Sequence, residues 1–136
     1  MNAPLYTTEI LRLAASLDVP VPLEREDGRA ELRSPTCGSR VITAVTLNDA
    51  GRVAALSQTV HACAFGQASA ALLQEGAVGR DQGQVDRALT QLNAWLGGSE
   101  TVPDWPGIAS LAPARSRKSR HGAILLPFRA FLAAMK

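Results

Sequence analysis

The chain has 136 residues, of which 46% are hydrophobic, and this fits one ordinary core in a single domain over residues 1–136. The formal charge at pH 7 is only +2, and most of it comes from one late basic segment, residues 115–120. Proteins that bind nucleic acid usually combine a broad basic face with stacking aromatic rings. With few aromatic residues in this chain, we expect no nucleic-acid partner.

No apolar run of about 18 residues is present, and the first residues lack the basic and apolar regions of a signal peptide. We therefore expect a cytoplasmic protein with no membrane partner. In a reducing compartment its two cysteines, Cys37 and Cys63, are not expected to form a structural disulfide. Metal binding, sulfur chemistry and plain burial as small apolar residues stay open for each of them.

The first pattern in chain order is helical, with apolar residues at three- and four-residue spacing over residues 5–17 and Thr7 or Thr8 available as the N-cap. The Val-Pro-Val-Pro segment at residues 19–22 ends this helix, because proline lacks an N–H donor and disfavours helical backbone in the residue before it. Residues 23–33 then predict either a short edge strand or a turn.

A hairpin follows. Residues 40–47 alternate between the two sides of a strand and are rich in β-branched side chains. Residues 48–51 form a turn with glycine placed for a positive φ, and residues 52–60 predict the returning strand. So short a connection favours antiparallel pairing.

The period becomes helical over residues 62–73, and Gly76 and Gly79 mark the predicted end of this helix. Cys63 therefore lies at or near a helix N-terminus. The positive end of the helix dipole favours the thiolate, which is the form that binds metals or attacks sulfur.

The rest of the chain predicts two further helices and a linker. Residues 81–96 form an amphipathic helix, residues 99–106 a linker, and residues 108–111 a short helical turn. Residues 117–135 form the last helix, in which Pro127 predicts a kink or a break into two pieces. The core is expected to consist of small aliphatic side chains in close packing instead of large rings.

Both thiols are expected at one end of the sheet, because Cys37 precedes the first strand of the hairpin and Cys63 follows the second. His121, at the start of the last helix, is a third candidate ligand, although a histidine beside arginines is more often a solvated surface residue. His61 is a further candidate, since residues two apart on a strand face the same side.

Together these blocks resemble the U-type iron–sulfur cluster assembly scaffolds, the NifU N-terminal, IscU and SufU group. The resemblance covers roughly residues 5–134. It rests on the order of four blocks: Cys37-Gly38-Ser39 before the first long strand, the hairpin turn at 47–53, Cys63 with the small-residue helix up to 70, and residues 113–125, which look like the family's last block.

The resemblance implies an α+β fold in which helices cover one face of a small antiparallel sheet. It also implies a site for zinc, iron or a nascent [2Fe-2S] cluster, and a cysteine desulfurase, a chaperone or an apo-acceptor protein as partners of a monomer or weak dimer. Cys37 and Cys63 match the family's first two cysteines, and His121 matches the histidine before the third. Ser39 stands where the family has aspartate, and Gly122 where it has the third cysteine.

The expected ligands are thus Cys37, Cys63 and His121, and a four-coordinate metal needs a water, His61 or an outside ligand to complete it. We expect a scaffold or sulfur-relay protein. The alternative is a degenerate relative that keeps the fold and acts as an interaction or regulatory protein without metal. A Cys-His enzyme is not expected, since no oxyanion motif and no orienting Asn or Asp near His121 is found. Residues 115–120 form either a solvated face or a docking patch.

Overall fold

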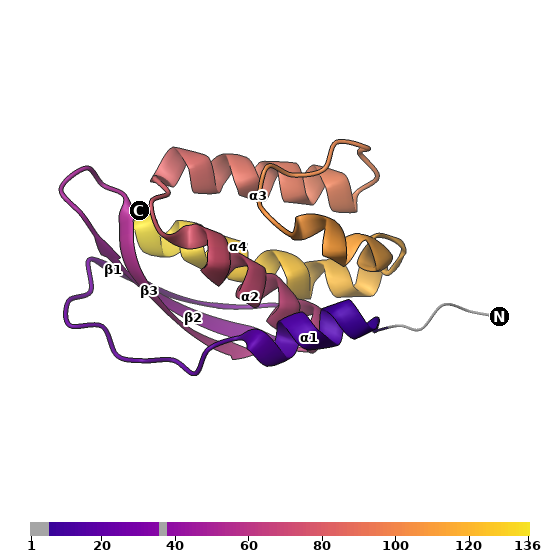
Figure 1. Ribbon diagram of the computed structural model, residues 1–136, viewed down its shortest axis with the longest axis horizontal. Helices are drawn as coiled ribbons and strands as arrows, with labels where there is room; N and C mark the ends of the chain where they lie inside the picture. Colours follow the sequence, from indigo (N-terminus) through magenta and orange to yellow (C-terminus); the bar gives the residue numbers. More distant parts are fainter. Residues whose placement is uncertain (1–5, 36–37) are drawn as a thin grey trace.

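The computed structural model describes residues 6–35 and 38–136 (Figure 1). Its sheet is antiparallel, with the strand order β1-β2-β3, and consists of β1 (Gly28–Arg33), β2 (Arg40–Leu47) and β3 (Val53–His61). The α-helices are α1 (Thr8–Ser16), α2 (Ala64–Ala77), α3 (Gln82–Leu96) and α4 (His121–Met135), and the 3₁₀ helices are η1 (Ile108–Ser116) and η2 (Lys118–Arg120). The predicted α+β class is confirmed. None of these helices is long and apolar enough to cross a membrane.

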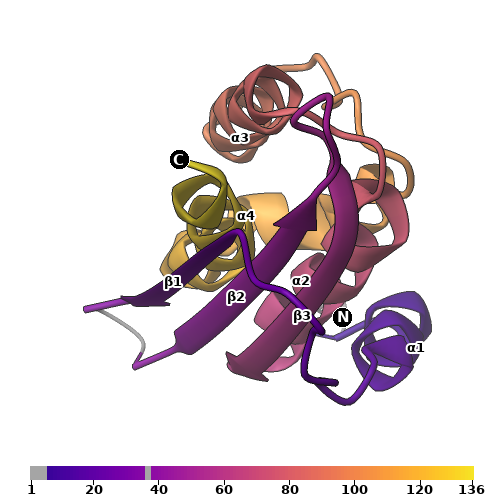
Figure 2. The ribbon, with the colours of Figure 1, turned by 90° about the vertical axis from the view of Figure 1, so that its left-hand side faces the viewer.

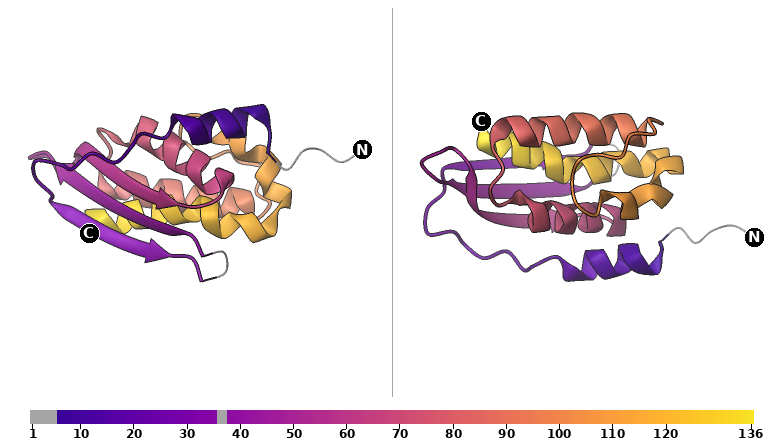
Figure 3. Two further views of the ribbon diagram at one scale, coloured as in Figure 1. Left: turned by 90° about the horizontal axis from the view of Figure 1, so that it is seen from below. Right: turned by 45° about the horizontal axis from the view of Figure 1, so that its top comes forward.

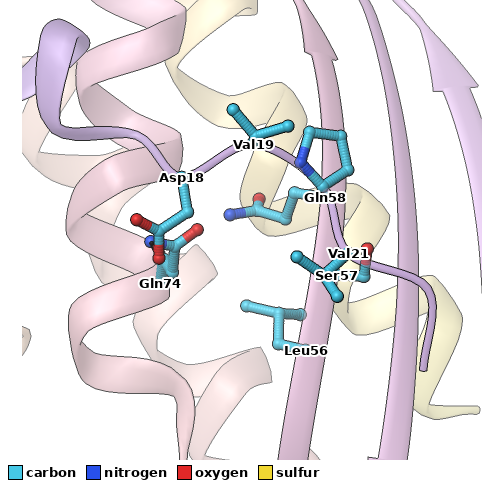
Figure 4. A pocket seen from close by; sticks show the side chains of 8 residues that line it. Asp18, Val19, Val21, Leu56, Ser57, Gln58 and Gln74 are labelled. Carbon is cyan, nitrogen blue, oxygen red and sulfur yellow. Dashed lines mark hydrogen bonds between the residues drawn. The ribbon is translucent and has the colours of Figure 1, made fainter. Parts of the chain in front are cut away.

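The helices lie on one face of the sheet, as predicted (Figure 2). Helix α4 packs against β1 and β2, and α2 packs against β3. Helix α1 lies against α2, and α3 packs on α4 in an outer layer (Figure 3). Helices α2 and α4 therefore carry the contact between the sheet and the rest of the core.

The hairpin matches its prediction closely. Strand β2 has the predicted bounds, and β3 begins and ends one residue later than predicted. The glycine of the turn, Gly51, has a φ of 76°. Of the two alternatives for residues 23–33, the edge strand is correct for Gly28–Arg33. Glycine is required at Gly28, because a Cβ there would lie 1.7 Å from the carbonyl oxygen of Ala134 in α4.

The first helix is capped as predicted, with the backbone N–H of Ile10 donating to Oγ1 of Thr7 at 3.1 Å. It buries Ile10 and Leu13. Leu11, which the periodicity placed on the buried stripe, is 51% exposed. The apolar stripe of α1 is therefore narrower than predicted.

Helix α2 ends four residues beyond the predicted range of 62–73, and Gly76 lies inside its last turn instead of marking its end. This glycine serves packing, since a Cβ there would lie 2.8 Å from the indole of Trp105. The helix ends at Ala77, and Gly79 follows it with a φ of 91°.

Of the two alternatives predicted at Pro127, a kink or a break, the break is wrong, because α4 continues from His121 to Met135. Proline has no N–H for the carbonyl of Ala123, four residues earlier. Helix α2 packs closely against α4 here: a Cβ on Gly66 would lie 3.1 Å from the Ala123 oxygen, and Ser69 Oγ donates to the carbonyl of the next residue, Ile124, at 2.6 Å.

The segment before α4 also differs from the prediction. The expected short turn at 108–111 is a 3₁₀ helix that extends to Ser116, and the last α-helix starts at His121 instead of residue 117. Pro113 lies inside η1, and the backbone of Arg117, at φ −107° and ψ 73°, separates η1 from η2.

Large rings contribute more to the core than predicted. All three phenylalanines are fully buried, and both tryptophans are at most 3% exposed. Tyr6 packs against Phe65, with ring centroids 5.0 Å apart. The expected close approach of small residues is confirmed at Gly66, but the expectation of a core without rings is wrong.

Candidate functional site

An open hollow of about 440 Å³ lies at the end of the sheet opposite the β2–β3 turn. It is lined by residues 38–39 at the start of β2, by residues 60–63 at the end of β3, and by Gln67 in the first turn of α2. We call it the cysteine hollow. The register explains its position, since Arg40 pairs with His61 at this end of the hairpin.

Cys63 is the N-cap residue of α2, with φ −67° and ψ 174°, and its thiol makes no capping hydrogen bond. The side chain is half-buried and not bonded in a disulfide. Its carbonyl accepts from the backbone N–H of Gln67 at 2.9 Å, which starts the helix. The predicted position at a helix N-terminus is confirmed, and Cys63 is one of the residues that line the open hollow.

Cys37 lies outside the residues that the structure describes. On the two sides of the residues left out, Ser34 N–H donates to the carbonyl of Ser39 at 2.9 Å, and Gly38 N–H donates to that of Ser34 at 3.2 Å. Gly38 has a φ of 71°. Since Gly38 and Ser39 line the cysteine hollow, the backbone directly after Cys37 borders the space that Cys63 faces.

His61 is the exposed last residue of β3 and lines the same hollow. The strand alternation that predicted it beside Cys63 does not apply, because β3 ends at His61 and Cys63 belongs to the cap of α2. The two side chains nevertheless border one space. His61 thus stays a candidate for a further ligand.

His121 is the first residue of α4, and its Nε2 lies 3.0 Å from the carbonyl oxygen of Ala114 and 3.1 Å from that of Arg115. Because a carbonyl oxygen only accepts, Nε2 carries the proton and donates, which leaves the lone pair on Nδ1. Among the described residues that line the cysteine hollow, His121 is not found. Its helix does start beside α2, where Ala123 lies against Gly66.

Two positions depart from the family's pattern. Ser39 is buried, with 4% of its surface exposed, and Gly122, which follows His121, has no side chain to bind a metal. Within residues 6–35 and 38–136 no group of three or more His, Cys, Asp or Glu is placed to hold a metal ion. Cys37 lies outside these ranges, so the three-residue ligand set stays a prediction.

The basic segment at residues 115–120 is partly structural. Arg115 donates from Nε to the carbonyl of Trp95 at 2.9 Å and from a terminal nitrogen to that of Ser99 at 2.7 Å, and its guanidinium lies 5.1 Å from the Trp95 ring centroid. Arg117 and Lys118 are exposed, and no ion pair to either is found in the described part of the chain. Arg115 is therefore an anchor for the loop after α3.

No protein-family model and no curated protein matches the chain. Solved structures do match it. A NifU-like protein (N-terminal part) from Brucella abortus is 28% identical, with a TM-score of 0.85 over 96% of this chain and 91% of its own. A putative iron-sulfur cluster assembly scaffold protein for the SUF system from Fervidobacterium islandicum is 20% identical, with a TM-score of 0.86 over 97% of each chain. The resemblance predicted from the sequence is confirmed.

Proposed function

We propose that this chain, which belongs to the U-type iron–sulfur cluster assembly scaffold family, is a scaffold or sulfur-relay protein. In this proposal Cys37, Cys63 and His121 hold a metal ion, zinc or iron, or a labile [2Fe-2S] cluster. The observation that carries it is the position of Cys63. Its thiol is free, lies at the N-terminus of α2, and lines an open hollow bordered by the residues that follow Cys37.

The chemistry of this hollow suits a metal ion or cluster that must be bound and later released. Thiolates are the ligands that iron–sulfur clusters and zinc prefer, and the positive end of the α2 dipole favours their negative charge. Three protein ligands leave one position of a tetrahedral metal open to an outside atom. Because the hollow opens to solvent, a partner protein can reach that position.

His121 has the hydrogen bonding expected of a metal ligand. A ligating histidine usually donates its second ring N–H to a carboxylate, a backbone carbonyl or a water, which fixes the ring and its tautomer. The contacts of Nε2 with the carbonyls of Ala114 and Arg115 serve this purpose, and we propose Nδ1 as the third ligand atom. A water, His61 or a partner's side chain completes the site.

A cysteine desulfurase is the proposed sulfur donor. The Cys63 thiolate attacks the outer sulfur of the donor's persulfide, a new S–S bond forms at Cys63, and the donor's S–S bond breaks with its electron pair leaving on the donor thiolate. No net oxidation occurs. The chain then passes sulfur or cluster to an apo-acceptor, directly or with a chaperone, and is itself a cytoplasmic, non-enzymatic monomer or weak dimer.

The second candidate function is a degenerate relative that acts as an interaction or regulatory protein. It is favoured by the loss of two family ligands, since Ser39 replaces the aspartate and Gly122 replaces the third cysteine. In that case both thiols stay unligated and the hollow serves as a docking surface alone.

Elemental analysis of protein purified without oxygen separates the two. The scaffold function predicts close to one equivalent of zinc or iron in the unmutated chain and less than about a tenth in Cys37→Ala and Cys63→Ala. Arg129→Ala is the control, since this exposed residue of α4 lies outside the hollow. Less than about a tenth of an equivalent in the unmutated protein, with a native circular dichroism spectrum, overturns the scaffold function.

A further inference from the structure

The guanidinium of Arg80, in the turn between α2 and α3, is held in place from two sides. Its Nε donates to the carbonyl of Gly76 at 2.9 Å, and its carbon lies 4.4 Å from the ring centroid of Trp105. Trp105 is itself fixed, since it is 3% exposed and its Nε1 donates to the carbonyl of Leu72 at 2.8 Å. The terminal nitrogens of Arg80 have no acceptor among the described residues.

Arg80 lines two neighbouring hollows, and Asp104 lines both of them as well. The smaller hollow, of about 100 Å³, is completed by one face of α3, namely Gln84, Arg87, Ala88 and Gln91. We call it the α3 pocket. Its lining is mostly polar, and two of its side chains are guanidinium groups.

The α3 pocket is rich in N–H groups that are free to donate. Arg87 is exposed and has no ion pair in the described part of the chain. The amide oxygen of Gln84 already accepts from the backbone N–H of Asp81 at 2.9 Å, and that of Gln91 accepts from the N–H of Asp104 at 2.9 Å. Both glutamines thus keep their Nε2 groups as donors. Four side chains can therefore offer N–H groups to one ligand.

We propose that the α3 pocket binds inorganic phosphate. Guanidinium groups match the oxygens of a tetrahedral oxyanion in pairs, and such charge-assisted hydrogen bonds are the strong ones. Arg80 is positioned before the ligand arrives, so little of its side-chain freedom is lost on binding. The volume admits one such ion and excludes a large organic anion from its interior.

Asp104 makes the pocket selective for an anion that carries a proton. Its carboxylate has no hydrogen bond or ion pair with any described residue. A carboxylate accepts a hydrogen bond from the P–OH of hydrogen phosphate, whereas sulfate has no proton at neutral pH and is repelled. The pocket therefore favours phosphate over sulfate.

The α3 pocket is separate from the cysteine hollow. Arg80 follows the C-terminal end of α2, whereas Cys63 caps its N-terminal end, and a helix of 14 residues spans about 21 Å. The phosphate site does not depend on Cys63 or on a metal. Its test is therefore independent of the scaffold function.

Calorimetric titration of the full chain at pH 7 and constant ionic strength tests the proposal. We expect saturable binding of sodium phosphate, and a tenfold or greater loss of affinity, which corresponds to about 1.4 kcal/mol, in Arg87→Gln. Arg129→Gln is the matched control, because it removes an equally exposed arginine from α4. Glycerol 3-phosphate, which is mostly a dianion without a P–OH at pH 7, is expected to bind more weakly than inorganic phosphate, and equal or tighter binding of this monoester overturns the role of Asp104.

The variant Asp104→Asn tests selectivity in the same titration. Sulfate is expected to bind at least about tenfold more weakly than phosphate to the unmutated chain, and to gain affinity in Asp104→Asn so that this preference shrinks. Absence of saturable phosphate binding, or equal affinities of Arg87→Gln and Arg129→Gln, overturns the proposal. Arg87, Asp104 and Arg129 are all exposed, so none of the three substitutions is expected to prevent folding.

Discussion

The two ends of the sheet differ in the hydrogen bonds made by the residues next to the strands. At the end that carries the β2–β3 turn, Asp27 accepts from the N–H of Leu47 at 2.7 Å, and Val53 exchanges backbone hydrogen bonds with Arg80 and Gly79 at 2.9 and 2.8 Å. At the other end, the Cys63 thiol makes no capping bond and His61 is exposed. We call these the turn end and the cysteine end (Figure 1).

This difference bears on which residues stabilise the fold and which are available to bind a metal or sulfur. The turn end joins strands and helices through many hydrogen bonds, so it holds the fold together. The cysteine end leaves a thiol and an imidazole available beside open space, and that availability is what a transfer site requires. We expect changes of buried residues at either end to affect folding, and changes of the available side chains Cys63 and His61 to affect metal or sulfur binding.

The largest loss of stability is expected at the turn end, from Trp105→Ala. The indole is buried against Gly76, donates to Leu72 and packs edge-on to Phe128 at 5.2 Å. Its removal is expected to lower the free energy of unfolding by about 3–5 kcal/mol. Urea unfolding measures this, with Val102→Ala, at a residue 48% exposed, as the control. A loss below about 1 kcal/mol contradicts the proposed role of this end.

A smaller loss is expected at the cysteine end from Gly66→Ala. The new methyl would lie 2.6 Å from the Cβ of Ala62, and the contact of α2 with α4 would have to widen, at a cost of about 1–3 kcal/mol. Gly83→Ala is the opposite control, since a Cβ in this turn of α3 meets nothing closer than 3.5 Å. It is expected to stabilise the protein by about 0.4–1 kcal/mol. Equal effects of the two changes would contradict the close approach of α2 and α4.

A pH-dependent contribution is expected from Asp27 at the turn end. The hydrogen bond from Leu47 N–H, and then that from Arg25, hold the pKa of this carboxyl below its ordinary value of 3.8. A folded-state pKa below the unfolded one stabilises the fold above pH 3.8, and this contribution is lost as the pH falls through the folded value. Thermal unfolding in acid should therefore depend less on pH in Asp27→Asn than in Asp86→Asn. The same pH dependence in both variants would refute this.

The smallest effect on stability is expected from Cys63→Ser, although it removes the proposed metal ligand. The thiol is half-buried and makes no capping hydrogen bond, so the free energy of unfolding without metal should change by less than about 1 kcal/mol. Urea unfolding in the presence of a chelator measures this. A loss as large as that of Trp105→Ala would show that Cys63 is a core residue and not a ligand.

Sequence periodicity predicted the features that depend on residues adjacent in the chain. Alternation fixed the bounds of β2, and the change of period placed Cys63 at the start of α2. The sequence did not show that α4 would continue past Pro127, where Gly66 and Ser69 of another helix pack against the turn before the proline. No sequence period indicates such a contact.

The order of the candidate ligands along the chain could be predicted from the sequence, but the contacts that hold their side chains could not. The positions of Cys63 and His121 near the starts of two helices followed from the helical periods, and their match to the family's order made them candidate ligands. The carbonyls that hold His121 belong to η1, a 3₁₀ helix whose full length no periodicity indicated. The stacking of Arg80 on Trp105 joins residues from separate elements, so the α3 pocket had no signal in the sequence.

The most direct test of the central claim is a count of the sulfur atoms bound to one metal. Zinc K-edge X-ray absorption of the zinc-loaded chain is predicted to show two sulfur ligands at about 2.3 Å. The count should fall to one in Cys37→Ser and in Cys63→Ser. A first shell of nitrogen and oxygen alone, or a sulfur count that Cys63→Ser leaves unchanged, would contradict the account.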